Sequence, residues 1–140
     1  MTRRTAVILS AVAYVLATFP LAILWHMVLF AGPYEEIQYI QREEPGFALA
    51  ILAMILQGGL LAWGYPRFVQ AGFGIKSGLA YSLVVGFFFW TAHVAAHAAK
   101  VEIGNLPLFF VLESLWLLVQ FGVFGIITGT LHGRVKEQPV

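Results

Sequence analysis

Four long apolar segments, separated by short polar connections, set the architecture of this 140-residue chain. A helix that crosses the roughly 30 Å hydrocarbon core of a bilayer needs about 20 predominantly apolar residues. The segments at 5–30, 47–64, 77–99 and 106–131 meet this requirement within a few residues. The sequence therefore predicts a single transmembrane domain over 1–140, an all-α bundle of four membrane-spanning helices.

The composition agrees with this architecture, because 60% of the residues are hydrophobic and only 11% are charged, with a mean hydropathy of +0.84. The net charge of +1 is spread over the connections and termini, which argues against nucleic acid as a partner. Cysteine is absent, so any metal would have to be held by histidine, glutamate or backbone oxygen.

The first apolar segment follows Arg3 and Arg4 and imitates a signal peptide. Its uncharged run outlasts the roughly 7–15 residues of a signal h-region, and no A-x-A site closes it, so we expect a spanning helix. Pro20 lies inside this helix, where its missing N–H and its ring predict a kink.

The connection at 31–46 is polar and acidic, and we expect it to form a short helix at the membrane surface. It carries Glu35, Glu36, Glu43 and Glu44 against a single basic residue, Arg42.

The lysines and arginines predict the orientation of the bundle. Six of the eight lie on the side that holds both termini and the second connection, namely Arg3, Arg4, Arg67, Lys76, Arg134 and Lys136. Arg42 and Lys100 lie on the other side. The positive-inside rule therefore predicts cytoplasmic termini, with 31–46 on the outer side.

Ionisable residues inside the apolar segments are the candidate site. His93 and His97 are four residues apart in the third segment, so a regular helix would place them on one face. At about 1.5 Å per residue, His26, His93 and Glu113 lie within roughly 5–10 Å of the same outer surface, with His97 slightly above them. Such residues usually face the bundle interior because they are costly in lipid. We therefore predict that His26, His93 and Glu113 converge on one pocket beneath the 31–46 connection.

A purely structural interpretation stands beside this one, in which each histidine does no more than bond a neighbouring helix. Gln57 and Gln120 lie near mid-membrane, and we expect them to join helices through side-chain hydrogen bonds. His132 falls at the opposite end from the cluster, where we expect it to be solvated or at headgroup level.

Small residues recur every four positions on two segments, at Gly78, Ser82 and Gly86 and at Gly125, Gly129 and Gly133. This spacing allows close helix approach. The contact formed is either between these two helices, or with a different helix, or with a second copy or a larger membrane complex.

The run KSGLAYSLVVGFFFW, the boundary WGYPRF and the histidine near the end of the first helix resemble small bacterial four-helix integral membrane proteins known as a domain of unknown function. The resemblance extends over most of the chain. It implies a four-helix fold in a bacterial inner membrane and says nothing about activity.

Three functions fit the sequence. In the first, His26, His93, His97 and Glu113 bind a divalent metal ion, a haem-like macrocycle or a small hydrophobic ligand. In the second, the chain is an accessory or assembly subunit without its own cofactor. In the third, it is an oligomeric carrier in which Glu113 and the histidines relay protons. No nucleophile with an adjacent base is recognisable, which makes an enzyme the less favoured interpretation.

Overall fold

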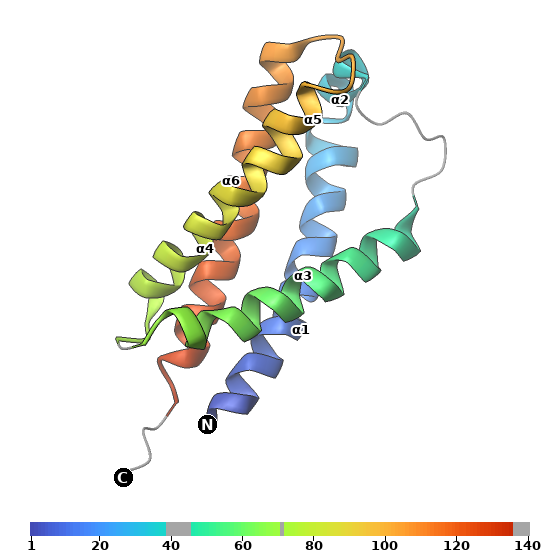
Figure 1. Cartoon of the computed structure of the whole chain (residues 1–140). Coiled ribbons are helices and arrows are strands. Elements are labelled where there is room, and N and C mark those ends of the chain that lie inside the picture. The colour runs from blue at the N-terminus through green and yellow to red at the C-terminus, as the bar shows by residue number, and fades with distance from the viewer. Residues whose placement is uncertain (39–45, 71, 136–140) are drawn as a thin grey trace.

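The computed structural model describes residues 1–38, 46–70 and 72–135, and these residues form helices and no β-strand. In chain order the elements are α1 (Arg3–Ile23), the π-helical segment η1 (Leu24–Leu29), α2 (Ala31–Ile37), α3 (Phe47–Phe68), α4 (Ile75–Trp90), the π-helical segment η2 (Thr91–Ala95), α5 (Ala96–Ala98) and α6 (Leu106–His132). Figure 1 shows the start of α1, the end of α3, the start of α4 and the end of α6 at one end, here named the base, and α2 and α5 at the other end, named the top.

Four helices in the described residues are long and apolar enough to cross a membrane, which indicates an integral membrane protein. They run over Arg3–Leu29, Phe47–Phe68, Ile75–Ala98 and Leu106–His132. These bounds agree with the predicted segments to within four residues at every end, so the predicted all-α class with four apolar helices is confirmed.

Local sequence accounts for the starts of α1 and α6. The hydroxyl of Thr2 accepts the backbone N–H of Thr5, and the side chain of Asn105 accepts the backbone N–H of Leu108. Both bonds satisfy amide groups that have no partner inside the first turn of a helix. Asn105 is followed closely by Pro107, whose fixed φ suits the first turn of α6.

The small residues of α4 and α6 pack against each other within one chain. A Cβ added to Gly78 would overlap the backbone of Gly125 and Gly129, and a Cβ added to Gly129 would overlap the backbone of Gly74 and Ile75. The two helix backbones can approach this closely only because side chains are missing between them. Of the alternatives left open by the sequence, the structure realises the contact between these two helices.

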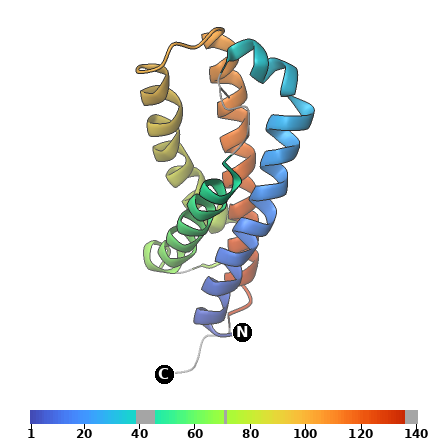
Figure 2. The ribbon, with the colours of Figure 1, turned by 90° about the vertical axis from the view of Figure 1, so that its right-hand side faces the viewer.

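Helix α3 crosses α1 obliquely, and its N-terminal half diverges from the rest of the bundle (Figures 1 and 2). Its buried residues all lie in the C-terminal part, from Gly58 to Pro66, whereas Leu49 and Leu52 near its start are more than half exposed. A Cβ added to Gly58 would overlap the ring of Tyr14 on α1, so the crossing depends on this glycine.

Buried polar side chains tie α1, α3 and α6 together in the middle of the bundle. The hydroxyl of Tyr14 donates a hydrogen bond to Oε1 of Gln57 at 2.9 Å and accepts one from Nε2 of Gln120. Nearer the base, the hydroxyl of Thr128 donates to that of Ser10 at 3.2 Å. The prediction that both glutamines join helices is confirmed.

His132 corrects a prediction, because it is buried rather than solvated, with an exposed fraction of 1%. Its Nδ1 donates to the backbone oxygen of Thr128 at 2.9 Å, and its ring packs against Tyr65 with centroids 4.8 Å apart. Its position near the chain terminus suggested contact with water, but the C-terminal part of α3 covers it.

Pro20 does not end α1, which continues through it to Ile23. Proline leaves the carbonyl four residues earlier without its usual helical partner, and the wider segment η1 begins four residues after Pro20. In η1 the backbone N–H of Phe30 donates to Trp25 at 3.1 Å, a bond that spans five residues. The structure thus has an irregular turn four residues after Pro20, and the kink at Pro20 itself stays a prediction.

Replacing Gly129 with alanine should destabilise the protein by about 1–3 kcal/mol, because the new methyl group meets backbone that cannot rotate away. Gly122→Ala is the matched control on the same helix, since nothing lies within 4 Å of its added Cβ. Thermal unfolding of both variants in the same detergent measures the difference. Equal unfolding midpoints for the two variants would contradict the close packing of α4 against α6 at this glycine.

Candidate functional site

The candidate site is built around Glu113, a glutamate of α6 with an exposed fraction of 0%. Moving an ionised carboxylate out of water is very costly unless it is paired and hydrogen-bonded. In this structure Glu113 receives three polar groups from three other elements, namely Tyr34 of α2, His26 of η1 and His93 of η2. Among the described residues, the two histidines are its ion-pair partners, and no lysine or arginine shares that role.

Tyr34 closes the site from above. Its hydroxyl donates to Oε1 of Glu113 at 2.6 Å, and its side chain is almost completely buried.

Helix α2 is held in place by its neighbours, since Nδ2 of Asn105 donates to Oε1 of Glu36 at 2.6 Å and the N–H of Gly104 donates to the oxygen of Ile37 at 3.2 Å. A short helix thus exists in this connection over Ala31–Ile37 and covers the cluster, while residues 39–45 of the connection lie outside the described residues.

His93 makes the closer of the two histidine contacts. Its Nε2 lies 3.0 Å from Oε2 of Glu113, a hydrogen bond that requires a proton on one of the two atoms. The ring stacks on Phe89 with centroids 5.4 Å apart, which fixes its plane. One third of the His93 side chain is exposed, so the residue links a fully buried carboxylate to the surface of the protein.

His26 approaches the other carboxylate oxygen. Its Nε2 is 3.8 Å from Oε1 of Glu113, while its Nδ1 lies 2.9 Å from the backbone oxygen of Ala22. A carbonyl oxygen only accepts, so Nδ1 must carry a proton. When His26 is neutral, its Nε2 therefore has a lone pair facing the carboxylate, and when His26 is charged, Nε2 has an N–H there. The ring is held between Tyr34 and Trp116, at centroid distances of 4.7 and 4.9 Å.

Both histidines that face Glu113 lie in π-helical segments. His26 is in η1 and His93 is in η2, where the N–H of Ala96 donates back to Thr91 across five residues. A π-helical turn contains an extra residue compared with an α-helical turn, so it rotates the following side chains out of register, and such turns occur frequently at functional sites. The two distortions therefore decide which way the imidazoles point.

Of the four predicted site residues, the structure brings together His26, His93 and Glu113. His97 lies beyond them in α5, where its ring is beside Phe109 with centroids 6.2 Å apart. The shared helix face predicted for His93 and His97 assumed a regular α-helix, and η2 ends that regularity between them.

Sequence reasoning missed Tyr34 and Trp116. Tyr34 was hidden because it belongs to the acidic connection rather than to an apolar segment. The available indication was Pro33 directly before it, which can start a helix. Trp116 is three residues after Glu113, and this spacing places it on the same side of α6.

The surroundings of the cluster limit which cofactors it can hold. Within the described ranges 1–38, 46–70 and 72–135, no group of three or more His, Cys, Asp or Glu side chains has the arrangement of a metal site. A cavity between α1, η1 and the start of α3 reaches His26 and has a volume of about 160 Å³. Ligand pockets usually measure roughly 300 Å³ or more, so this space is too small for a haem-like macrocycle.

No protein-family model, curated protein or solved structure matches this chain. The chemical role of the cluster therefore has to follow from the hydrogen bonds, burial and charges of its own residues.

Tyr34→Phe should destabilise the protein by about 1.5–3 kcal/mol, because hydrogen bonds to charged groups are stronger than neutral ones and Glu113 would lose its closest donor. Tyr81→Phe is the control, since the Tyr81 hydroxyl donates to a neutral backbone oxygen, that of Leu61, at 3.1 Å. Denaturant titration of the two variants compares the losses. A loss at Tyr34 no larger than that at Tyr81 would argue against an ionised Glu113.

Proposed function

We propose that the protein is a proton-coupled membrane carrier whose proton-binding site is the cluster of His26, His93, Glu113 and Tyr34. The observation that carries this proposal is a fully buried carboxylate within 3.0 and 3.8 Å of two imidazole nitrogens. Acids and histidines placed together inside a membrane protein serve as proton relays in pumps and transporters. The contact between His93 and Glu113 already has hydrogen-bond length, so proton exchange between these two residues needs no rearrangement, whereas His26 would have to move closer.

We take His93 as the entry to this site, because its side chain is the more exposed of the two histidines, at 33% against 18% for His26. When the ring has taken up a proton from solvent, its Nε2 gives a proton to Oε2 of Glu113 and the ring returns to its neutral form. The reverse sequence releases the proton. The imidazole thus moves protons between solvent and a carboxylate that water does not reach directly.

His26 makes the cluster respond to its protonation state. Because Nδ1 already carries the proton that it donates to the backbone oxygen of Ala22, a second proton can only be placed on Nε2, opposite Oε1 of Glu113. The contact changes from two facing lone pairs to an attractive ion pair when that proton arrives. Since His26 belongs to η1 and touches the ring of Tyr34 on α2, this change acts directly on the element that covers the site.

A proton that leaves the cluster downward would meet further polar side chains along the α1–α6 interface. Gln120 and Tyr14 bond each other in mid-bundle, and Ser10 and Thr128 do so nearer the base. In the carrier, these groups would continue the proton path toward the base. A single chain of four helices has little interior room, so we expect an oligomer to complete the transport path.

The membrane orientation is part of the proposal. Of the basic residues used to predict it, Arg42 and Lys136 lie outside the described residues, and five of the others lie at the base: Arg3, Arg4, Arg67, Lys76 and Arg134. The positive-inside rule then places the base in the cytoplasm and the cluster near the outer surface. The resemblance to small bacterial membrane proteins favours the bacterial inner membrane.

A divalent metal ion is the second candidate occupant, and the anchoring of His26 favours it. Metal-binding histidines usually donate their other ring N–H to a carbonyl or carboxylate, as Nδ1 of His26 does to Ala22. Binding would require the two imidazoles and Glu113 to draw together to ligand distances of about 2.0–2.2 Å from a shared ion.

Glu113→Gln should abolish proton flux into proteoliposomes, because the amide cannot ionise while it keeps the shape of the side chain. Glu102→Gln is the matched control, since Glu102 is an exposed acid outside the cluster at the same end of the bundle. A pH-sensitive dye inside the vesicles reports the flux after an imposed pH step. If the parent protein conducts no more than empty vesicles, the carrier is wrong and the accessory-subunit interpretation is favoured.

Elemental analysis of the purified protein distinguishes a metal-binding site from a proton-binding site. A stoichiometric metal that is lost in the His26→Ala variant would replace the carrier proposal with the metal site. We expect the parent protein to contain no stoichiometric metal.

A further inference from the structure

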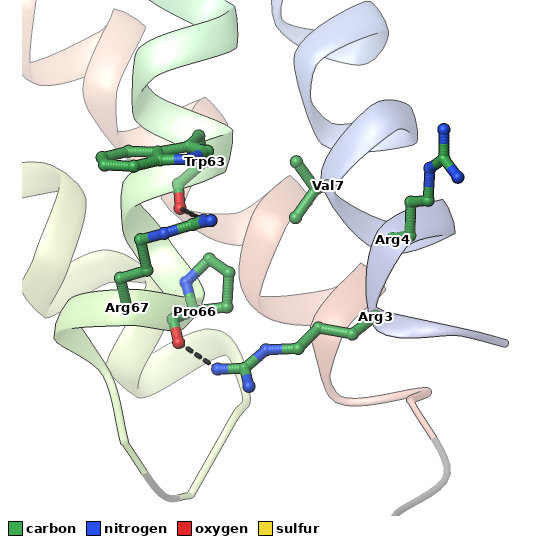
Figure 3. A pocket seen from close by; sticks show the side chains of 6 residues that line it. All are labelled: Arg3, Arg4, Val7, Trp63, Pro66 and Arg67. Atoms are coloured by element: carbon green, nitrogen blue, oxygen red, sulfur yellow. Dashed lines mark hydrogen bonds between the residues drawn. The ribbon is translucent and has the colours of Figure 1, made fainter.

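The base of the molecule contains a cavity of about 460 Å³ between α1 and α3, lined by Arg3, Arg4, Val7, Trp63, Pro66 and Arg67 (Figure 3). We propose that it binds the phosphate headgroup of an anionic phospholipid. This site is remote from the His26–Glu113 cluster, which lies at the top of the bundle, and is independent of the carrier proposal.

Two of the arginines are already oriented by backbone carbonyls. Arg3 of α1 donates to the oxygen of Pro66, and Nη1 of Arg67 donates to the oxygen of Trp63 at 2.7 Å (Figure 3). The Arg67 guanidinium also lies over the Trp63 ring, 4.0 Å from its centroid. Each guanidinium has five N–H donors, so both keep donors for a phosphate after making these contacts.

The bond from Arg3 follows from the end of α3. The last carbonyls of a helix have no partner inside the helix, and they attract cations. Pro66 lies in the last turn of α3, which ends at Phe68, so its oxygen is one of these groups. The arginine that satisfies it is thereby fixed at the mouth of the cavity.

The charge of this cavity is not neutralised by carboxylates in the described part of the chain. The four glutamates that the structure describes, Glu35, Glu36, Glu102 and Glu113, belong to α2, the α5–α6 connection and the upper part of α6. All of them lie in the upper part of the molecule, whereas the arginines lie at the base. An anion at the base therefore meets guanidinium groups without a competing acid from these residues.

The position of the cavity favours a lipid over free phosphate. Arg3 begins one apolar span and Phe68 ends another, so the arginines lie at the level where headgroups meet the hydrocarbon core. Val7, Trp63 and Pro66 provide an apolar wall beside them, and Trp63 is half exposed, as interfacial tryptophans are. Clusters of basic residues at this level attract anionic lipids.

The test compares headgroups on the detergent-purified full chain. Short-chain phosphatidylglycerol, short-chain phosphatidylcholine and inorganic phosphate are titrated separately, and the rise in unfolding temperature gives an apparent affinity for each. We expect phosphatidylglycerol to stabilise the protein more than the other two.

Arg67→Gln should weaken phosphatidylglycerol binding about fivefold, as expected for one lost basic contact. Lys76→Gln removes an exposed charge at the same end but outside the cavity, and should leave the affinity unchanged. Equal effects of the two variants, or equal stabilisation by phosphatidylcholine, would show general surface attraction and overturn the site. Equal stabilisation by inorganic phosphate would overturn the lipid assignment.

Discussion

The burial of one carboxylate imposes the strongest constraint on this structure. Glu113 lies on the most buried helix, and its exposed fraction is 0%, so it must be surrounded by donors. Its polar partners come from η1 and α2, which are neighbours in the sequence, and from η2, which is far from both. The top of the bundle is consequently held together by polar contacts directed at a single residue. Below it, apolar and small side chains pack together, and the hydrogen bonds of Tyr14 and Thr128 join the helices.

The helix formed by α4, η2 and α5 has two parts, one that packs closely against α6 through glycines and one that contributes His93 to the polar cluster. In the lower part, Gly78 and Gly125 bring α4 and α6 into backbone contact. Above them, the ring of Phe121 packs against Gly86, so a large side chain lies between the two helices. His93 lies above this point, where space exists for an imidazole between the helices. Close approach below and separation above are therefore both needed to place His93 beside Glu113.

The sequence allowed the height of each site residue to be predicted but not its direction. Hydropathy and the cost of charge in lipid placed His26, His93 and Glu113 at one level, because 1.5 Å per residue is a reliable scale. The direction of His93 depends on η2, and nothing in the alanine-rich sequence around it distinguishes a π-helical from an α-helical turn. Tyr34 was missed for a different reason. A docked surface helix has no periodic pattern long enough to reveal which side is buried.

Charge is separated along the length of the molecule, and this separation links its two proposed sites. The described glutamates lie at the top, and five of the six described lysines and arginines lie at the base, Lys100 being the exception. A cytoplasmic membrane surface rich in anionic lipid attracts the basic end and repels the acidic one. Lipid binding by Arg3 and Arg67 would thereby fix the orientation that leaves His93 facing the outer side. A carrier that takes protons from that side needs this orientation, so the two sites favour the same insertion without touching each other.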